Sequence, residues 1–240
     1  MASLSPLKFV QVAARAKHSA TVIFVHGLGD TGYGWKPIAE MFSADPALSH
    51  VKWVLPHAPT RRITANMGME MPAWFDIESF DFKTEDERGM LQTVHQLNQL
   101  ITAEVDAGTP ADRIVLGGFS QGGAVTLLTG LTTERKLGGL TVLSGWVPLK
   151  SKIKSMASDH VKKLPIFWGH GKADPLVRHI WGVQSAEFLK DTFGIKTADE
   201  SEPKLTGITF RSYDGVPHST SEAELEDLQK WLQKVIPQEA

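Results

Sequence analysis

Short apolar runs alternate with segments of helical periodicity along most of the chain. Six runs rich in β-branched and aromatic residues predict strands: Ala20–Val25, Val51–Leu55, Arg113–Gly118, Leu140–Ser144, Pro165–Gly169 and Ile208–Tyr213. A shorter run, Lys8–Val12, predicts one more strand near the start. Several runs are apolar throughout, which is typical of strands covered on both faces. The alternation predicts an α/β fold with a mostly parallel central sheet and helices on both faces.

Two helices are marked by regular apolar stripes. The members of the first, at steps of three and four, are Met90, Val94, Leu97, Ile101 and Val105. The members of the second, near the C-terminus, are Leu225, Leu228, Leu232 and Val235. Ser219, Thr220 and Ser221 precede the second stripe and are candidate N-caps, because their hydroxyls can accept from free backbone amides. Each stripe predicts a helix that packs on the sheet by one face.

Composition narrows the class of protein. The chain has 240 residues, 42% of them hydrophobic and 22% charged, which fits one domain spanning residues 1–240. It contains no Cys, which excludes disulfides, cysteine-bound metal clusters and a thiol nucleophile. Its net charge of −2 at pH 7 argues against a nucleic-acid partner, because such proteins neutralise phosphates with an excess of Lys and Arg.

Sequence signals for membrane insertion and secretion are absent. No apolar run approaches the ~20 residues needed to span a bilayer. The first residues lack the apolar block of a secretory signal, and Ala2 excludes N-myristoylation. These observations predict a soluble, cytoplasmic protein.

Two polar features stand apart from the predicted elements. A basic cluster consists of Lys150, Lys152, Lys154, Lys162 and Lys163. Such a charge run is typical of a solvated face, and the alternative is a patch for a membrane or a partner. Gly194–Gly207 is polar and predicts a surface loop before the last strand.

Candidate chemistry begins at Gly118-Phe119-Ser120-Gln121-Gly122, a G-x-S-x-G sequence. It follows an apolar run and precedes a helical pattern, and this strand–turn–helix context is what a nucleophile elbow requires. The flanking residues are glycines because the turn is tight. The turn exposes the Ser120 hydroxyl, and the free N–H groups of the following helix point toward charge that develops there. Ser120 is therefore the candidate nucleophile.

A serine nucleophile needs a base and a group that orients the base. Asp174 follows the predicted strand Pro165–Gly169, and His218 follows Ile208–Tyr213. Each alone has an ordinary explanation, since Asp before Pro often starts a turn and a lone loop His is often a surface residue. With Ser120 they stand in the Ser, Asp, His order of α/β-hydrolases, at the carboxyl ends of parallel strands. This order predicts a Ser120–Asp174–His218 triad on an α/β-hydrolase fold.

Acyl transfer also needs two N–H donors for the oxyanion. One is expected to be the backbone amide of Gln121, directly after the nucleophile, and the other that of Leu28, in the glycine-rich loop after the first long strand. His26 opens this loop and is expected to hold it by hydrogen bonds, and His57 and His170 are expected to be structural. No His pairs with carboxylates at metal-ligand spacing, so no metal or other cofactor is predicted.

Six sequence blocks are more specific than the serine motif. In chain order they are Phe24–Asp30 followed by Trp35, Leu55–Pro59, Met71–Asp76, Gly118–Ala124, His170–Val177 and His218. Together they resemble the blocks of the acyl-protein thioesterases, part of the wider phospholipase/carboxylesterase family, over roughly residues 19–236. The resemblance implies an α/β-hydrolase fold without a large lid domain.

The resemblance also implies an activity, the hydrolysis of fatty-acyl thioesters on protein cysteines together with carboxylic and lysophospholipid esters. The implied substrates are S-acylated proteins or lipid esters, met in transient contact with a membrane surface. Enzymes of this kind hold the acyl chain in a shallow apolar channel, whose positions here would be Met67, Met69, Met71, Trp74 and Leu176. Methionine suits a channel that adapts to different chains, and core filling is the alternative for each Met. An exposed rim would also allow a weak homodimer.

Two other functions fit parts of the sequence. A general carboxylesterase or lysophospholipase would use the same triad on small or lipid esters. A small-molecule receptor on the same fold would bind its ligand without turnover, because fold does not fix function. Such receptors commonly lose a triad residue, whereas this chain keeps all three.

Overall fold

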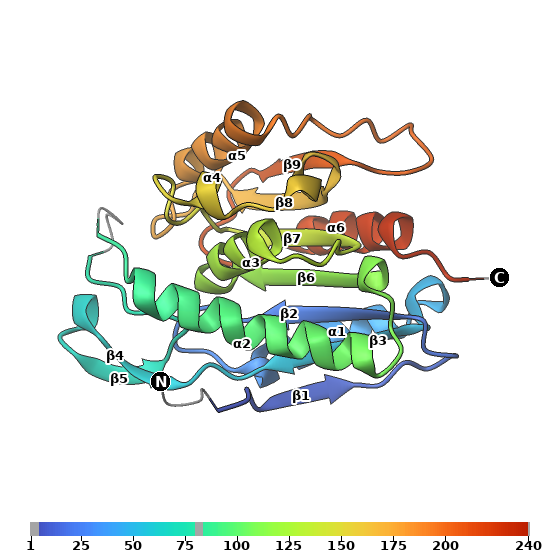
Figure 1. Cartoon of the computed structure of the whole chain (residues 1–240), viewed down its shortest axis with the longest axis horizontal. Helices are drawn as coiled ribbons and strands as arrows, with labels where there is room; N and C mark the ends of the chain where they lie inside the picture. Colours follow the sequence, from blue (N-terminus) through green and yellow to red (C-terminus); the bar gives the residue numbers. More distant parts are fainter. Residues whose placement is uncertain (1–4, 80–83, 240) are drawn as a thin grey trace.

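Seven strands form the central sheet of the protein, for which a computed structural model describes residues 5–79 and 84–239. In chain order they are β1 (Phe9–Val12), β2 (Ala20–Val25), β3 (Val51–Pro56), β6 (Ile114–Phe119), β7 (Gly139–Leu143), β8 (Pro165–Gly171) and β9 (Gly207–Tyr213). Their order across the sheet is β1-β3-β2-β6-β7-β8-β9 (Figure 1). Strand β1 is antiparallel to β3, and the other neighbours are parallel. The predicted, mostly parallel sheet is confirmed.

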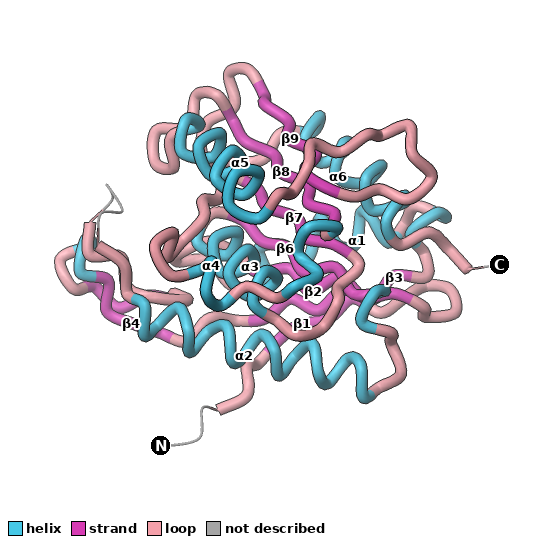
Figure 2. Tube along the Cα trace, turned by 45° about the horizontal axis from the view of Figure 1, so that its top comes forward, coloured by secondary structure: helices cyan, strands magenta, loops and turns pink. Residues whose placement is uncertain are grey.

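Helices cover both faces of this sheet. Those of the described residues are α1 (Gly32–Ser43), α2 (Glu87–Asp106), α3 (Gln121–Thr132), α4 (Ile153–Met156), α5 (His179–Phe193) and α6 (Glu222–Val235). Figures 1 and 2 show α2 to α5 on one face and α1 with α6 on the other. No helix in residues 5–79 and 84–239 is long and apolar enough to cross a membrane.

The predicted stripes are the faces by which α2 and α6 pack. Met90 and Leu97 of α2 are buried in the core on one side of the sheet, whereas Leu228 of α6 is buried in the core on the other side. Ser221 is the N-cap of α6, and its hydroxyl accepts from the backbone amide of Glu224 at 3.2 Å. Both predicted helices are confirmed, and one of the three candidate caps is used.

Most predicted strand bounds differ from the observed ones by one or two residues, and only Ala20–Val25 matches at both ends. Strand β6 begins at Ile114 because Arg113 ends a short 3₁₀ turn. Strand β7 ends at Leu143 because Ser144 adopts a φ of 50°, outside the extended region. The parallel strands thus end together at the edge where Ser120 stands.

A small hairpin at this carboxyl edge was not predicted. It consists of β4 (Thr60–Ile63) and β5 (Met69–Pro72), paired antiparallel beside the main sheet (Figure 1). Its strands have four residues each and are largely exposed, so they lack the apolar alternation that marks a packed strand. The hairpin projects from the sheet next to the loop that follows β2.

Both polar features of the sequence lie at the surface. All five lysines of the basic cluster are exposed, and Lys152 forms an ion pair with Glu87 at 2.5 Å. Gly194–Gly207 is mostly a loop, joined to β9 by one isolated bridge between Thr197 and Ile208. The structure confirms that the basic cluster and the polar loop lie at the surface.

Candidate active site

Ser120 stands at the sharp turn between β6 and α3. Its φ of 56° and ψ of −119° lie in a region that costs a non-glycine residue roughly 1–3 kcal/mol. A Cβ on Gly118 would collide with the backbone of Gly122, and a Cβ on Gly122 would collide with the carbonyl oxygen of Val25. The two glycines of the motif therefore let strand and helix approach closely enough to hold the serine in this conformation.

The three predicted triad side chains are hydrogen-bonded in series. His218 Nε2 lies 2.8 Å from Ser120 Oγ, and His218 Nδ1 lies 2.6 Å from Asp174 Oδ2. The carboxylate accepts from Nδ1–H, which leaves Nε2 free to accept the serine proton. The Asp174 side chain is fully buried and that of His218 is 14% exposed, so the relay is largely shielded from water.

The loop after β8 fixes the carboxylate. Asp174 Oδ1 accepts from the backbone amides of Leu176 and Val177, both at 2.9 Å. Burial alone would raise the pKa of Asp174, but the hydrogen bond and positive charge from His218 and the two amide bonds outweigh it and lower that pKa. His170 donates from Nε2 to the carbonyl of Val177 at 2.8 Å, and burial lowers the pKa of this imidazole. The structural role expected of His170 is thus to hold the same loop.

The glycine-rich loop after β2 packs against the nucleophile. A Cβ on Gly27 would lie only 3.4 Å from that of Ser120, and Gly29 has a φ of 79° that favours glycine. The amide of Gly29 donates to Pro72 at 2.9 Å, which ties this loop to the end of β5. Among the described residues, the backbone amides of Leu28 and Gln121 have no hydrogen-bond acceptor. Both amides are thus available to a ligand oxygen.

The histidines near this loop hold it in place. His26 donates from Nδ1 to the carbonyl of Gly27 at 2.7 Å and accepts at Nε2 from the amide of Ala58 at 3.1 Å. The bond that Nε2 accepts requires a neutral ring, and burial, which lowers the pKa of His26, favours that form. His57 Nδ1 accepts from the amide of Gly32 at 3.1 Å. The expected structural roles of His26 and His57 are confirmed.

The side chain of Gln121 has a second role that the sequence analysis missed. It is fully buried, its Oε1 accepts from the Trp74 amide at 2.8 Å and its Nε2 donates to the Phe75 carbonyl at 2.7 Å. The Trp74 indole in turn donates to the carbonyl of His26 at 2.8 Å. A polar residue at the start of an otherwise buried, apolar helix was the available signal. These bonds lock the segment after β5 to the nucleophile turn.

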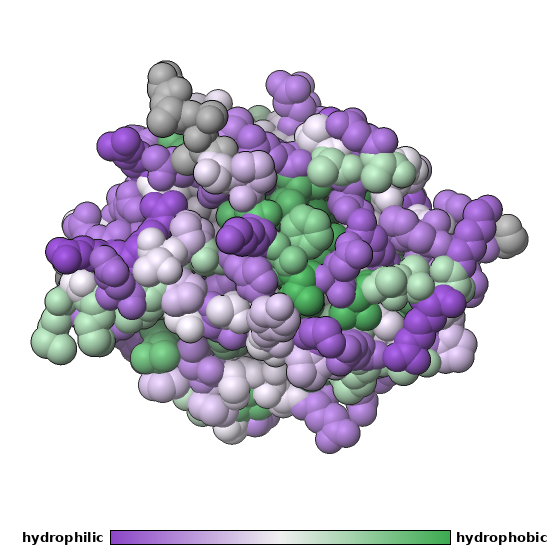
Figure 3. All heavy atoms as spheres, turned by 90° about the horizontal axis from the view of Figure 1, so that it is seen from below, coloured by the Kyte–Doolittle hydropathy of each residue, from purple (hydrophilic) through white to green (hydrophobic). Residues whose placement is uncertain are grey.

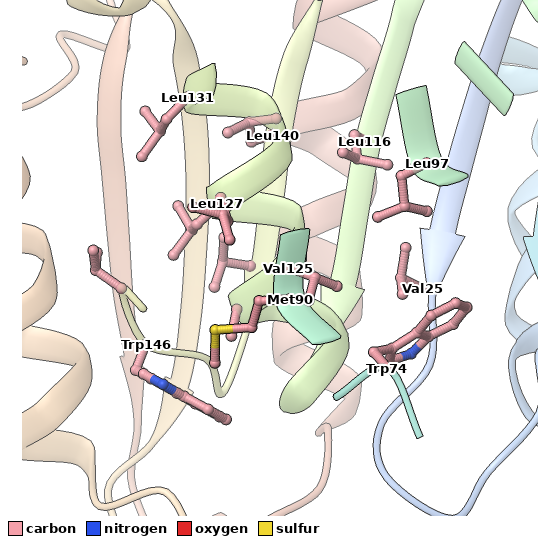
Figure 4. Close-up of a cluster of buried hydrophobic side chains, with 14 of the residues drawn as sticks. Val25, Trp74, Met90, Leu97, Leu116, Val125, Leu127, Leu131, Leu140 and Trp146 are labelled. Carbon is pink, nitrogen blue, oxygen red and sulfur yellow. The ribbon is translucent and has the colours of Figure 1, made fainter. Parts of the chain in front are cut away.

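The five predicted acyl-binding residues fall into two environments. Met67, Met69 and Leu176 are exposed by 91%, 52% and 51%. Figure 3 shows pale green side chains at its left end, the end at which Figure 1 shows β4 and β5. Met71 is half-buried and packs against the core, with its sulfur near Gly29. Trp74 has no exposed surface and lies among the core side chains of Figure 4, so the structure places it beneath the site rather than on an open wall.

The described residues contain no group of three or more His, Asp or Glu side chains placed to hold a metal ion. The polar groups at the carboxyl edge are instead engaged in the relay and in the loops that frame it. An exposed apolar hairpin lies beside them.

Comparison with known proteins assigns the family. The sequence model of the family described as phospholipase/carboxylesterase matches residues 7–236. The chain belongs to the phospholipase/carboxylesterase family. As a member, it is an ester hydrolase with an α/β-hydrolase fold, and the sequence resemblance is confirmed.

Individual known proteins match this chain over nearly their whole length. Acyl-protein thioesterase 1 of Cryptococcus neoformans is 48% identical over 235 residues, which are 96% of this chain and 98% of the relative. Acyl-protein thioesterase 1 of Mycosarcoma maydis is 42% identical, over 98% of this chain and 99% of the relative. The crystal structure of Arabidopsis thaliana SOBER1 is 34% identical with a TM-score of 0.82, over 91% of this chain and 99% of that one.

Proposed function

We propose that the protein is a serine hydrolase that cleaves fatty-acyl thioesters from protein cysteines, together with related carboxylic esters. The observation that carries the proposal is the relay in which His218 lies 2.8 Å from Ser120 Oγ and 2.6 Å from Asp174. The thioester substrate is supported by the two fungal relatives named acyl-protein thioesterase 1. A cytoplasmic location stays a prediction from the sequence.

In the first half of the reaction, Ser120 Oγ attacks the acyl carbonyl carbon while His218 Nε2 takes the hydroxyl proton. Asp174 keeps the imidazole in the Nδ1–H tautomer and stabilises its cationic form. The backbone amides of Leu28 and Gln121 donate to the oxygen that becomes negative. Those amides have no other acceptor among the described residues, so they need not break a bond to do so.

In the second half, His218 gives its proton to the departing sulfur or oxygen, which leaves the acyl group on Ser120. A water molecule then attacks the acyl carbon, and His218 takes one of its protons. The new tetrahedral species collapses to the fatty acid as His218 returns that proton to Ser120 Oγ. The cycle needs only groups that the relay already holds in contact.

The exposed apolar side chains of the carboxyl edge are the proposed contacts for the acyl chain and for a membrane surface. Met67 and Met69 project on the hairpin, and Leu176 lies two residues beyond Asp174. Met71, on β5 of the hairpin, lies with its sulfur near Gly29 of the oxyanion loop and would continue the acyl path inward, with Trp74 supporting it from the core. An S-acylated protein presents its thioester at a lipid surface, so an apolar rim around the serine suits that approach.

The test compares wild-type protein with Ser120→Ala on p-nitrophenyl esters from C2 to C16 and on a palmitoyl thioester peptide. Loss of Ser120 should lower kcat by several orders of magnitude, because the nucleophile, base and orienter act as a unit. Thr220→Ala, a change of a nearby hydroxyl in the loop after His218, is the matched control and should leave kcat within twofold.

Serine-dependent turnover that favours long chains and the thioester supports the proposal. Turnover confined to short esters would assign the protein to the general carboxylesterases instead. Saturable ester binding without product would assign it to the receptors. Normal turnover by Ser120→Ala would remove the triad assignment itself.

A further inference from the structure

A cleft lies at the edge of the sheet opposite to Ser120. It has a volume of about 650 Å³ and is lined at the amino ends of four strands, by Arg113, Gly138, Leu164 and Thr206, which precede β6, β7, β8 and β9. This is the end of the molecule at which Figure 1 shows the C-terminus. Ligand pockets in proteins commonly have volumes of 300–1,000 Å³. The catalytic relay uses none of these residues.

The charged groups that line the cleft are mostly cationic. The basic side chains are Arg113, Lys136, His160, Lys163, Lys204 and Lys234, against the single carboxylate of Asp112. Arg113 pairs with the carboxylate of Glu239 at 3.6 Å and donates to the carbonyl of Pro237, and Lys234 donates to the carbonyl of Glu200. In the described part of the chain, the other three lysines, Lys136, Lys163 and Lys204, have no ion-pair partner. A locally positive cleft on a chain with a net charge of −2 needs an explanation.

His160 and Lys136 line the cleft together, and the charge of Lys136 acts on the imidazole of His160. Burial lowers the pKa of this imidazole first, and the charge of Lys136 lowers that pKa further against the opposing Asp159. Its Nε2 is buried and has no hydrogen-bond partner among the described residues. A buried polar atom without a partner is uncommon in folded proteins, and a bound ligand is one way to satisfy it.

The cleft also has an apolar floor. Leu137 and Leu164 are 2% exposed and Leu205 is 3% exposed, and all three line it. Pro165 and Pro203 lie beside them. The basic cluster and the polar loop Gly194–Gly207 both contribute to this cleft. Lys163 of the cluster and residues 203–206 of the loop line it. A rim of ammonium groups above apolar side chains matches an anion with a short hydrocarbon body.

We propose that this cleft binds an amphiphilic phosphate, with the phosphate held by Lys136, Lys163 and Lys204 and the hydrocarbon part on Leu137, Leu164 and Leu205. The phosphate oxygens supply the acceptors that these lysines lack among the described residues. The apolar part displaces water mainly from Pro165 and Pro203, with the nearly closed leucine floor beneath. The site is separate from the catalytic edge, so the proposal stands apart from the proposed thioesterase activity.

The test is titration calorimetry of the full chain with n-octyl phosphate, with inorganic phosphate and neutral octyl glucoside as separate arms. Octyl phosphate should bind with a 1:1 stoichiometry and at least tenfold more tightly than either control ligand. Lys163→Gln should weaken binding about tenfold, because one charge-assisted contact is lost. Lys162→Gln is the matched control, since this neighbouring lysine is exposed but does not line the cleft.

Amide chemical shifts locate the ligand independently of affinity. Octyl phosphate should shift the backbone signals of Gly138 and Thr206, while turnover of a short p-nitrophenyl ester stays unchanged in Lys163→Gln. Shifts confined to Leu28 and Gln121 would place the ligand at the catalytic edge and overturn the proposal. Equal binding of inorganic phosphate and octyl phosphate, or equal weakening by Lys162→Gln and Lys163→Gln, would overturn it as well.

Discussion

The nucleophile turn and the β4–β5 hairpin lie at the same edge of the sheet, but the turn is held by buried hydrogen bonds and close packing, whereas much of the hairpin is exposed. Around Ser120, glycines fill spaces that admit no Cβ, and the side chain of Gln121 is buried with its amide oxygen and nitrogen both paired. On the hairpin, Met67 and Met69 are largely exposed, and each strand has only four residues. The turn is closely packed, whereas the hairpin is anchored by the buried Ile63 and leaves Met67 and Met69 exposed.

The difference matches what each region is proposed to do. Proton transfer between Ser120 and His218 requires groups held within hydrogen-bond distance, and an error of 1 Å in such a contact costs about 10²-fold in rate. An acyl chain makes non-directional contacts, so exposed thioether side chains can rearrange around chains of different lengths. Rigidity is therefore concentrated where chemistry is directional.

The largest expected effect comes from Asp174→Asn in the rigid region. An amide at this position cannot hold the His218 Nδ1–H tautomer, so kcat should fall about 10⁴-fold with little change in Tm. The assay is p-nitrophenyl butyrate hydrolysis beside thermal melting. Asp214→Asn, which removes an exposed carboxylate near Lys172, should leave kcat within twofold. A loss below tenfold for Asp174→Asn would show that the relay does not set the rate.

The next effect tests the link between the two regions. Gln121→Ala leaves the Trp74 amide and the Phe75 carbonyl buried without partners, which should lower the free energy of unfolding by roughly 4 kcal/mol. Urea unfolding measures this change. Thr126→Val is the matched control on the same helix, because the buried Thr126 hydroxyl has no partner among the described residues. Similar losses for the two variants would mean that the Gln121 bonds do not stabilise the turn.

The stability of the folded protein should depend on pH through Glu224. This first-turn residue of α6 is fully buried against Gly169. Its carboxyl oxygens lack hydrogen-bond partners among the described residues. Burial raises the pKa of Glu224 to about 7. The folded state therefore binds the proton more tightly than the unfolded state, whose pKa is near 4.5. Stability from this group is complete below about pH 4.5 and is lost as the pH rises to 7, by about 3 kcal/mol.

Glu224→Gln should remove this loss, so the variant should be more stable relative to wild type at pH 8 than at pH 5. Buried histidines such as His26 and His170 act in the opposite direction, because their lowered pKa values favour folding as the pH rises. They are common to both proteins, so the difference between the two urea-unfolding series isolates Glu224. Glu222→Gln, an exposed change in the same turn, should show no such difference. Parallel curves for wild type and Glu224→Gln would contradict the assignment.

The smallest expected effect concerns the exposed hairpin. Met67→Ser with Met69→Ser should weaken binding to phosphatidylcholine vesicles about tenfold, because two exposed apolar side chains no longer enter the lipid surface. Turnover of p-nitrophenyl acetate should stay unchanged. Met41→Ser is the control, since Met41 is 49% exposed near the far end of α1. Vesicle sedimentation measures the binding.

Two outcomes would reverse this part of the comparison. Equal vesicle binding by the control and the double variant would show that the hairpin is not the lipid contact. Analytical ultracentrifugation in which only the wild type associates with rising concentration would assign the same side chains to a homodimer. A monomer across the whole range leaves the lipid surface as their proposed partner.

The sequence by itself determined the sheet, its packed helices and the order of the candidate catalytic residues. A continuous apolar run marks the strand Ala20–Val25 because this strand is buried along its whole length. The turn at Ser120 could be predicted because Gly118 and Gly122 flank the serine between an apolar run and a helical pattern, although the contact that requires Gly122 is with the distant Val25. Apolar runs and short motifs reflect local sterics and the burial of one face of an element. Both can be read from residues that are close together in the sequence.

Only the tertiary structure decided how the surroundings of the relay are held. The backbone amide of Trp74 donates to Gln121, 47 positions away, and its indole donates to the carbonyl of His26, so partners distant in the sequence hold this residue in the core. The basic cleft depends on loops that converge from distant parts of the chain, including Lys136, Lys163 and Lys204. Sequence periodicity cannot predict such contacts, because loop residues do not alternate regularly between buried and exposed positions. Their neighbours are determined by the packing of the whole sheet.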